Sequence, residues 1–160
     1  MSGGRQISVV GGATGEPDVL RDAEAVGRGI AEAGAVLVCG GRTGVMEAAS
    51  KGASEAGGVV IGVLPTLSRA DANPYVSHVV ATGIGEARNL AVVGSGDAVI
   101  AIGGEWGTLS EIAYARKLGR TVVAIRSWAL HNASGTELGI IEASGPDEAV
   151  KAALAAIESG

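Results

Sequence analysis

The chain has 160 residues, of which 47% are hydrophobic, and its formal net charge is -5 at pH 7. This length and apolar content predict a single domain, spanning residues 1–160, and the acidic balance gives no basic surface for DNA or RNA. The single cysteine, Cys39, excludes an intrachain disulfide and a cysteine zinc cluster and favours a cytoplasmic location. The apolar runs are too short to span a membrane, so we expect no membrane partner.

Short β-branched runs alternate with longer Ala-rich stretches, a pattern typical of parallel βαβ units. In chain order we expect a strand at Ile7–Val10, a helix over 17–33, a strand at Val36–Cys39, a helix over 44–56, strands at Val59–Val63 and His78–Ala81, a helix over 84–95, a strand at Ala98–Ile102, a helix over 107–118, a strand at Thr121–Ile125 and a helix over 146–158. The strands are apolar on both alternating faces, so both faces of the sheet need cover. The predicted fold is therefore α/β, a doubly wound parallel sheet.

A Gly-Gly-x-x-Gly pattern directly follows three of the expected strands. It reads GGATG at 11–15, GGRTG at 40–44 and GGEWG at 103–107, and ATGIGE at 81–86 is a looser version. Loops after parallel strands meet at one edge of the sheet, where α/β proteins bind ligands. Glycines admit a ligand close to the backbone, and helix N-termini attract anions, so the pattern predicts a phosphate-bearing ligand. The alternative is that the glycines only permit short turns.

Several familiar sites are excluded. There is no G-x-x-x-x-G-K-[ST] P-loop, no strict G-x-G-x-x-G follows the first strand, and Cys39-Gly40 stands where a dinucleotide enzyme has an acid, so NAD is not expected. His78 and His131 lack metal-ligand spacing, and there is no serine nucleophile motif, so we expect no metal site.

The stretches VLVCGGRTGVMEAASKGASEAGG (36–58), VIGVLP (60–65) and EARNLAVVGSGDAVIAIGGEWGTLSE (86–111), together with their order, resemble the LOG ("Lonely Guy") proteins, formerly named lysine decarboxylases. The resemblance is strongest to their short bacterial relatives and to molybdenum-cofactor carrier proteins. It implies a Rossmann-like homodimer that binds a nucleoside 5'-monophosphate, and in the family's enzymes the N-glycosidic bond is hydrolysed.

By this resemblance the catalytic residues are Arg88 and Glu111, and the phosphate loop includes Gly104, Gly107 and Thr108. Together with the other glycine loops, the expected ligand-binding residues also include Gly11, Gly12, Gly40, Gly41, Thr43, Gly44, Glu105 and Trp106. No cofactor is required by this interpretation, and a bound nucleotide or phosphorylated pterin is the expected ligand.

Three residues depart from the pattern of the hydrolases: Asn89 replaces a lysine, Gly103 a proline and Glu105 a glycine. A carboxylate beside a bound phosphate is repelled by about 1 kcal/mol or more unless it is well solvated. Two alternatives to hydrolysis therefore stay open. One is a non-catalytic carrier or sensor of a phosphorylated cofactor such as molybdenum cofactor, and the other is an interaction subunit with a vestigial pocket.

Some of these residues also have purely structural interpretations. Arg88 suits an exposed helix face over which it would snorkel, and Thr108-Leu109-Ser110-Glu111 matches a capping box, in which Glu111 serves only the helix N-terminus. Trp106 suits either stacking on a ligand ring or packing in a dimer. Residues 126–139 are expected to form a polar loop at the rim of the site.

Overall fold

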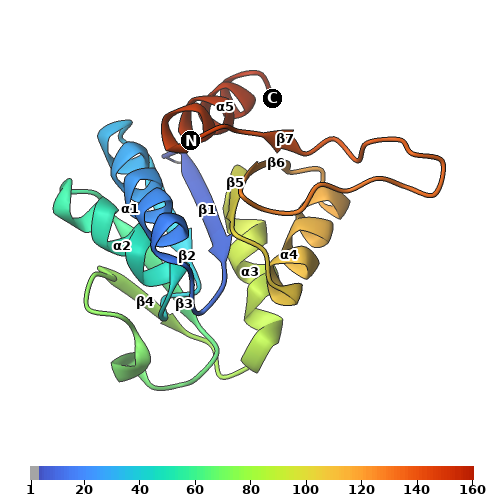
Figure 1. Ribbon diagram of the computed structural model, residues 1–160. Helices are drawn as coiled ribbons and strands as arrows, with labels where there is room; N and C mark the ends of the chain where they lie inside the picture. Colours follow the sequence, from blue (N-terminus) through green and yellow to red (C-terminus); the bar gives the residue numbers. More distant parts are fainter. Residues whose placement is uncertain (1–3) are drawn as a thin grey trace.

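A seven-stranded parallel sheet forms the centre of the computed structural model, which describes residues 4–160 (Figure 1). The strand order is β4-β3-β2-β1-β5-β6-β7. The strands are β1 (Gln6–Gly11), β2 (Val36–Cys39), β3 (Val60–Leu64), β4 (His78–Ala81), β5 (Ala98–Ile102), β6 (Thr121–Ile125) and β7 (Ile141–Glu142). The α-helices are α1 (Pro17–Glu32), α2 (Val45–Glu55), α3 (Arg88–Ser95), α4 (Trp106–Lys117) and α5 (Pro146–Glu158), and the 3-10 turns are η1 (Arg69–Asp71) and η2 (Gly85–Ala87). None of the helices in this range is long and apolar enough to cross a bilayer.

The predicted doubly wound α/β fold is confirmed, with two local differences. β7 was not predicted because it has only two residues, which pair with Val123 and Ala124 at the edge of the sheet and are too few to show an alternating pattern. The helix expected from residue 84 becomes α-helical only at Arg88. Gly83 and Gly85 have φ values of 66° and 62°, outside the helical region, so the chain first makes the single turn η2.

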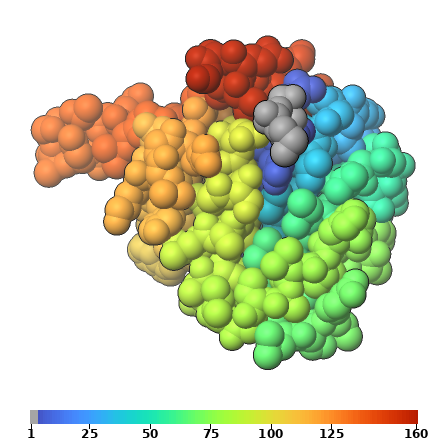
Figure 2. Space-filling model, turned by 180° about the vertical axis from the view of Figure 1, so that it is seen from behind, coloured from blue at the N-terminus to red at the C-terminus, as the bar shows by residue number. Residues whose placement is uncertain are grey.

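Helices cover both faces of the sheet. α1, α2 and α5 pack on one face against side chains such as Ile7 and Val9, whereas α3 and α4 pack on the other against Val10 and Val99. Figure 2 shows the molecule from behind, with α3 and α4 on the near face. All five residues of β5 are buried, as expected for a central strand covered on both sides.

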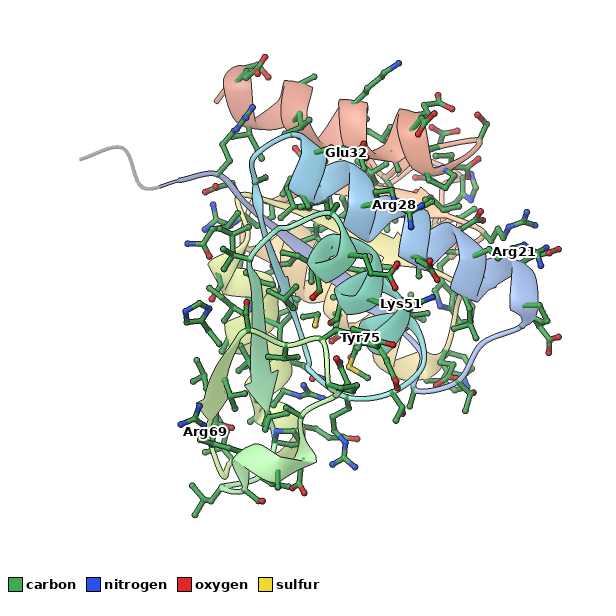
Figure 3. All side chains as sticks on the ribbon, turned by 90° about the vertical axis from the view of Figure 1, so that its left-hand side faces the viewer. Arg21, Arg28, Glu32, Lys51, Arg69 and Tyr75 are labelled. Carbon is green, nitrogen blue, oxygen red and sulfur yellow. The ribbon has the colours of Figure 1, made fainter. Side chains whose placement is uncertain are left out.

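The helices α1 and α2 touch backbone to backbone through two glycines. A Cβ atom on Gly27 would lie 1.9 Å from the carbonyl oxygen of Ala49, and one on Gly52 would lie 1.9 Å from that of Glu24. Beside this contact, Lys51 of α2 donates to Glu24 of α1 over 3.1 Å, and Figure 3 shows Lys51 on this surface. The two helices therefore form one rigid layer behind the loops that follow β1 and β2.

Residues 126–140 form an arm that extends well beyond the sheet (Figures 1 and 2). His131 and Glu137 form an isolated antiparallel bridge near its tip. The side-chain oxygen of Asn132 accepts hydrogen bonds from the backbone of Ser134 and Thr136, and Arg116 of α4 donates to the Leu138 carbonyl. The expected polar loop is thus an ordered hairpin-like excursion held by local hydrogen bonds.

Candidate functional site

A cleft opens where the chain reverses its direction of winding. β2 lies on one side of the central strand β1 and β5 lies on the other, so the loops that leave β1 and β5 diverge. Gly11 pairs with Ile102, the last residue of β5, and both loops therefore start side by side. Ligands of open α/β sheets bind at such a switch point. A cavity of about 170 Å³ lies here, between the loop after β1, Gly40, the start of α3 and the first two turns of α4.

The amino-terminal end of α4 faces this cavity. The helix begins at Trp106, and its N-cap residue, Glu105, makes no side-chain capping bond. Thr108 and Glu111 are therefore the third and sixth helical residues, and the predicted capping box is wrong. The physical reason is that the chain becomes helical directly after Glu105, so Thr108 cannot occupy the non-helical cap position. The Thr108 side chain is 2% exposed, and its hydroxyl has no hydrogen-bond partner within residues 4–160.

Arg88 is buried beside Thr108 in the wall of the same cavity. Its Nη1 donates to the carbonyl oxygens of Gly40 (2.5 Å) and Val63 (2.6 Å), at the ends of β2 and β3. The expectation that Arg88 snorkels over an exposed helix face is wrong, because the side chain is only 9% exposed. Gly40 makes this burial possible, since a Cβ atom there would lie 2.2 Å from Nη1. The Nε atom of Arg88 is buried without a partner in the described structure.

Glu111 lines the cavity opposite this guanidinium. Burial raises the pKa of its carboxyl to about 7, although the positive charge of Arg88 pulls that pKa down. Burial also lowers the pKa of Arg88, and the charge of Glu111 opposes this shift. At neutral pH, Glu111 is therefore present in both protonation states and can donate as well as accept a hydrogen bond.

Glu105 divides the cleft. Its carboxylate lies over Gly12, where a Cβ atom would be 2.6 Å from Oε1. On one side is the cavity with Arg88, and on the other is a hollow of about 310 Å³ between the loops 12–16 and 103–105, down to Val19. Glu105 therefore belongs to both spaces.

Two indole rings border the Glu105 backbone. The rings of Trp106 and Trp128 have centroids 5.3 Å apart and are tilted by 35°, and Trp106 is 78% exposed. Trp128 donates from Nε1 to the carbonyl oxygen of Glu105 over 3.2 Å and covers Gly104. Trp128 was missed in the sequence, although its place shortly after β6, at the same edge of the sheet, was a usable signal.

The other expected binding residues lie outside the cavity and hold the loops together. Thr43 donates to the carbonyl oxygen of Ala13 (2.9 Å), and Gly44 packs on the same backbone. Gly41 is buried against Gly62. The cavity wall also includes Ala13, Met46, Glu86 and Asn89, which the sequence reasoning did not assign to the site.

The backbone of the loop after β5 explains one departure from the hydrolases. Gly103 has a φ of 72°, whereas the proline ring fixes φ near -65°. A proline therefore cannot replace Gly103 in this loop as it is folded here.

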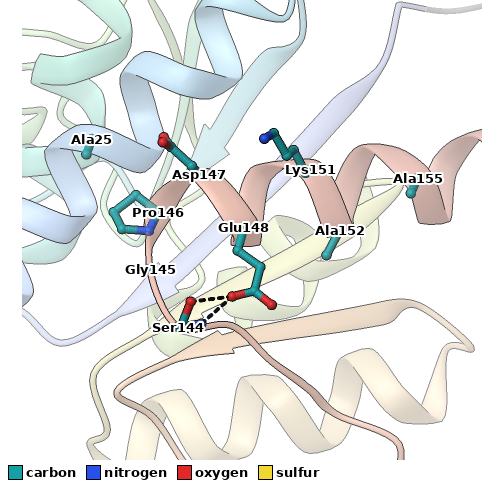
Figure 4. A pocket seen from close by; sticks show the side chains of 9 residues that line it. All are labelled: Ala25, Ser144, Gly145, Pro146, Asp147, Glu148, Lys151, Ala152 and Ala155. Carbon is teal, nitrogen blue, oxygen red and sulfur yellow. Dashed lines mark hydrogen bonds between the residues drawn. The ribbon is translucent and has the colours of Figure 1, made fainter.

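A second hollow, of about 870 Å³, runs beside the start of α5 (Figure 4). Three of its nine lining residues are alanines, and the carboxylate of Glu148 accepts hydrogen bonds from the backbone and side chain of Ser144. It shares no residue with the glycine loops, and none of the buried polar atoms that lack a partner in the described chain belongs to it. The cleft between the loops after β1 and β5 is therefore the stronger candidate for the ligand-binding site.

The comparison with known families agrees with this geometry. The profile of the SLOG cluster4 family matches residues 4–157. The chain belongs to the SLOG cluster4 family. The resemblance to LOG-type proteins inferred from the glycine motifs is thus confirmed.

Relatives of the chain have been found among both sequences and solved structures. An uncharacterized protein of Archaeoglobus fulgidus is 44% identical over 121 residues, which are 76% of this chain and 80% of that protein. The structure of the molybdenum cofactor binding protein from Rippkaea orientalis superposes with a TM-score of 0.90 at 36% identity, covering 98% of this chain and 99% of that one. The molybdenum cofactor carrier protein of Chlamydomonas reinhardtii gives a TM-score of 0.84 at 32% identity, covering 97% and 99%. The family fold is thus shared over nearly the whole chain.

Proposed function

We propose that this protein binds a phosphorylated small molecule in the cleft and serves as a carrier for a phosphorylated pterin of the molybdenum-cofactor type. The observation that carries the proposal is the buried, unpartnered hydroxyl of Thr108, together with the unpartnered Nε of Arg88, because both residues belong to the wall of one cavity. Buried polar groups in folded proteins nearly always have a partner, so two orphan donors around one cavity indicate a bound acceptor.

The electrostatics of α4 support an anionic ligand. This helix has twelve residues and no side-chain cap, so the amides of its first turn remain free to donate. The aligned peptide dipoles place about half a positive charge at this end. Thr108 and the guanidinium of Arg88 add a hydroxyl donor and a full positive charge, which together suit a phosphate group.

A carrier fits the side chains better than a hydrolase does. Cleavage of an N-glycosidic bond needs a negative charge near the developing ribosyl cation. Glu111 is the acidic group opposite Arg88, and burial raises its pKa to about 7, which disfavours the charged form that cleavage needs. Two relatives, at 36% and 32% sequence identity, are named for binding or carrying molybdenum cofactor, which supports the same conclusion.

The first test removes the orphan hydroxyl. Thr108→Val keeps the shape of the side chain, and we expect it to weaken binding of inorganic phosphate, measured by calorimetry, by about 10-fold or more. The free energy of unfolding should not fall, because no hydrogen bond is lost. The matched control is Ser110→Ala, which removes a hydroxyl on the same helix that is exposed and bonds to Gly107. Equal phosphate affinity in Thr108→Val and wild type would show that phosphate does not bind in this cavity, and would contradict the proposal.

The nature of the cargo is tested on protein isolated from its own host. Small molecules released by heat should include a phosphorylated pterin by mass spectrometry, and the Thr108→Val protein should release much less of it. Recovery of nucleotides alone, with no pterin, would contradict the carrier function while leaving phosphate binding intact.

One observation favours hydrolysis as a second candidate function. A carboxyl with a pKa of about 7 can protonate a leaving base, and Glu111 shares its cavity with Arg88. If this is the function, wild type releases the free base from AMP or from GMP, and Glu111→Gln loses about 100-fold or more of the rate. The measurement is chromatography of the free base over several hours. No base release by a wild-type protein that binds phosphate would exclude this candidate.

A further inference from the structure

Glu105 is an exposed residue that lines both hollows of the cleft, and its carboxylate has no role in holding an anion. Its only polar contact in the described structure is a long hydrogen bond from the hydroxyl of Thr14, at 3.4 Å. It forms no ion pair with any residue of 4–160. An ionised carboxylate has about four acceptor positions, so most of them remain free to face the two cavities.

The position of Glu105 is fixed by its neighbours. Its carbonyl oxygen accepts hydrogen bonds from the Trp128 indole and from the Leu109 amide, at 3.2 and 3.0 Å. Gly12 leaves the space that the carboxylate occupies. These contacts hold the backbone of Glu105, and its carboxylate lies against Gly12 and Thr14.

We propose that Glu105 recognises the ring of the ligand by accepting hydrogen bonds from two adjacent N–H groups of a 2-amino-4-oxopyrimidine edge. That edge offers a ring N–H beside an exocyclic amino group, which matches the two oxygens of a carboxylate in a bidentate pair. Guanine and pterins share this edge. Adenine, hypoxanthine and lumazine lack the adjacent pair of donors.

This inference adds the ligand class to the proposed function and rests on it for the location of the ligand. The phosphate is held by the start of α4 and Arg88, where the donors lie, and the ring is held at Glu105, where acceptors lie. The exposed indole of Trp106, beside the half-buried indole of Trp128, provides an aromatic surface, and such surfaces favour flat heterocycles. The negative charge of Glu105 then discriminates between ligands by their rings rather than by their phosphates.

The experiment compares two pairs of ligands that differ only at the 2-position. Calorimetry is run with GMP against IMP, and with 6-hydroxymethylpterin against 6-hydroxymethyllumazine. Wild type should prefer the amino-bearing member by about 10-fold or more. Glu105→Gln presents one acceptor and one donor in place of two acceptors, so its preference should fall below about 3-fold. Glu47→Gln, which removes a carboxylate from the first turn of α2, should keep the wild-type preference.

The outcomes separate this inference from the proposed function. A preference within the pterin pair or the guanine pair supports the inference and identifies which of the two rings is the ligand. Equal affinities within both pairs overturn it, and so does a preference that survives in Glu105→Gln. The phosphate-free pterin pair tests Glu105 even where the phosphate site fails. A loss of phosphate binding in Thr108→Val beside equal affinities in wild type would leave the proposed function standing and reject only the role of Glu105.

Discussion

Gly27→Ala is expected to lower the free energy of unfolding by about 3 kcal/mol, the upper range for an overpacked core position. Its new Cβ atom would lie 1.9 Å from the carbonyl oxygen of Ala49, far inside van der Waals contact. The clash is with backbone, so no side chain can rotate away, and α1 and α2 have to separate. Gly52→Ala makes the reciprocal clash with Glu24 and should cost a similar amount.

The control for this prediction is Gly94→Ala in α3. No atom lies closer than 4.0 Å to a Cβ placed there, so this change should add up to about 1 kcal/mol through higher helix propensity. Urea denaturation of the three variants and wild type provides the comparison. Similar stabilities for Gly27→Ala and Gly94→Ala would show that the two helices do not pack backbone to backbone.

Glu111→Gln is expected to be more stable than wild type at pH 8, by up to about 3 kcal/mol. The folded-state pKa of about 7 lies above the ordinary value of 4.5, so folded wild type binds more protons than the unfolded chain between these values. The stability of wild type therefore falls as the pH rises from about 4.5 to 7, at about 1.4 kcal/mol for each pKa unit. Glutamine does not ionise, so the variant lacks this fall, and the two proteins should converge near pH 4.

A second glutamate, Glu148, is expected to show the opposite dependence of stability on pH and serves as the control. Hydrogen bonds from Ser144 lower the pKa of Glu148, which contributes stability above pH 4.5 that is lost as the pH falls. Glu148→Gln should thus be less stable than wild type at neutral pH, and the difference should shrink as the pH falls below 4.5. Both pH dependences are tested by thermal denaturation of all three proteins between pH 4 and 8. Glu148→Gln and wild type are also measured at pH 3. Parallel curves for Glu111→Gln and wild type would mean that Glu111 is solvated and its pKa ordinary.

The candidate site was predicted only in part. Eight of the residues singled out in the sequence lie around one cavity: Gly11, Gly12, Gly40, Arg88, Glu105, Gly107, Thr108 and Glu111. Their roles in binding remain predictions. The pattern Thr108-x-x-Glu111 was misleading because a capping box is a local signal, and the start of α4 is set instead by the loop that Trp128 and Ile125 hold through hydrogen bonds to Glu105 and Gly103.

The layers of this protein and the edge at which its glycine loops meet follow from the pattern of amino acids alone. β-branched runs such as Ala98–Ile102 are buried on both faces, and parallel strands joined by helices must return to the same edge. These signals are local and repeat along the chain, so they can be read without coordinates.

What the glycines and charged residues do at that edge depends on the packed three-dimensional structure. Arg88 bonds to carbonyl groups 48 and 25 residues away, and Gly40 is required because its missing side chain leaves room for that guanidinium. Whether the Thr108 hydroxyl finds a hydrogen-bond partner likewise depends on every group packed around it. Such contacts join segments distant in sequence, and no local pattern encodes them, because their energy comes from burial and geometry that exist only once the sheet has formed.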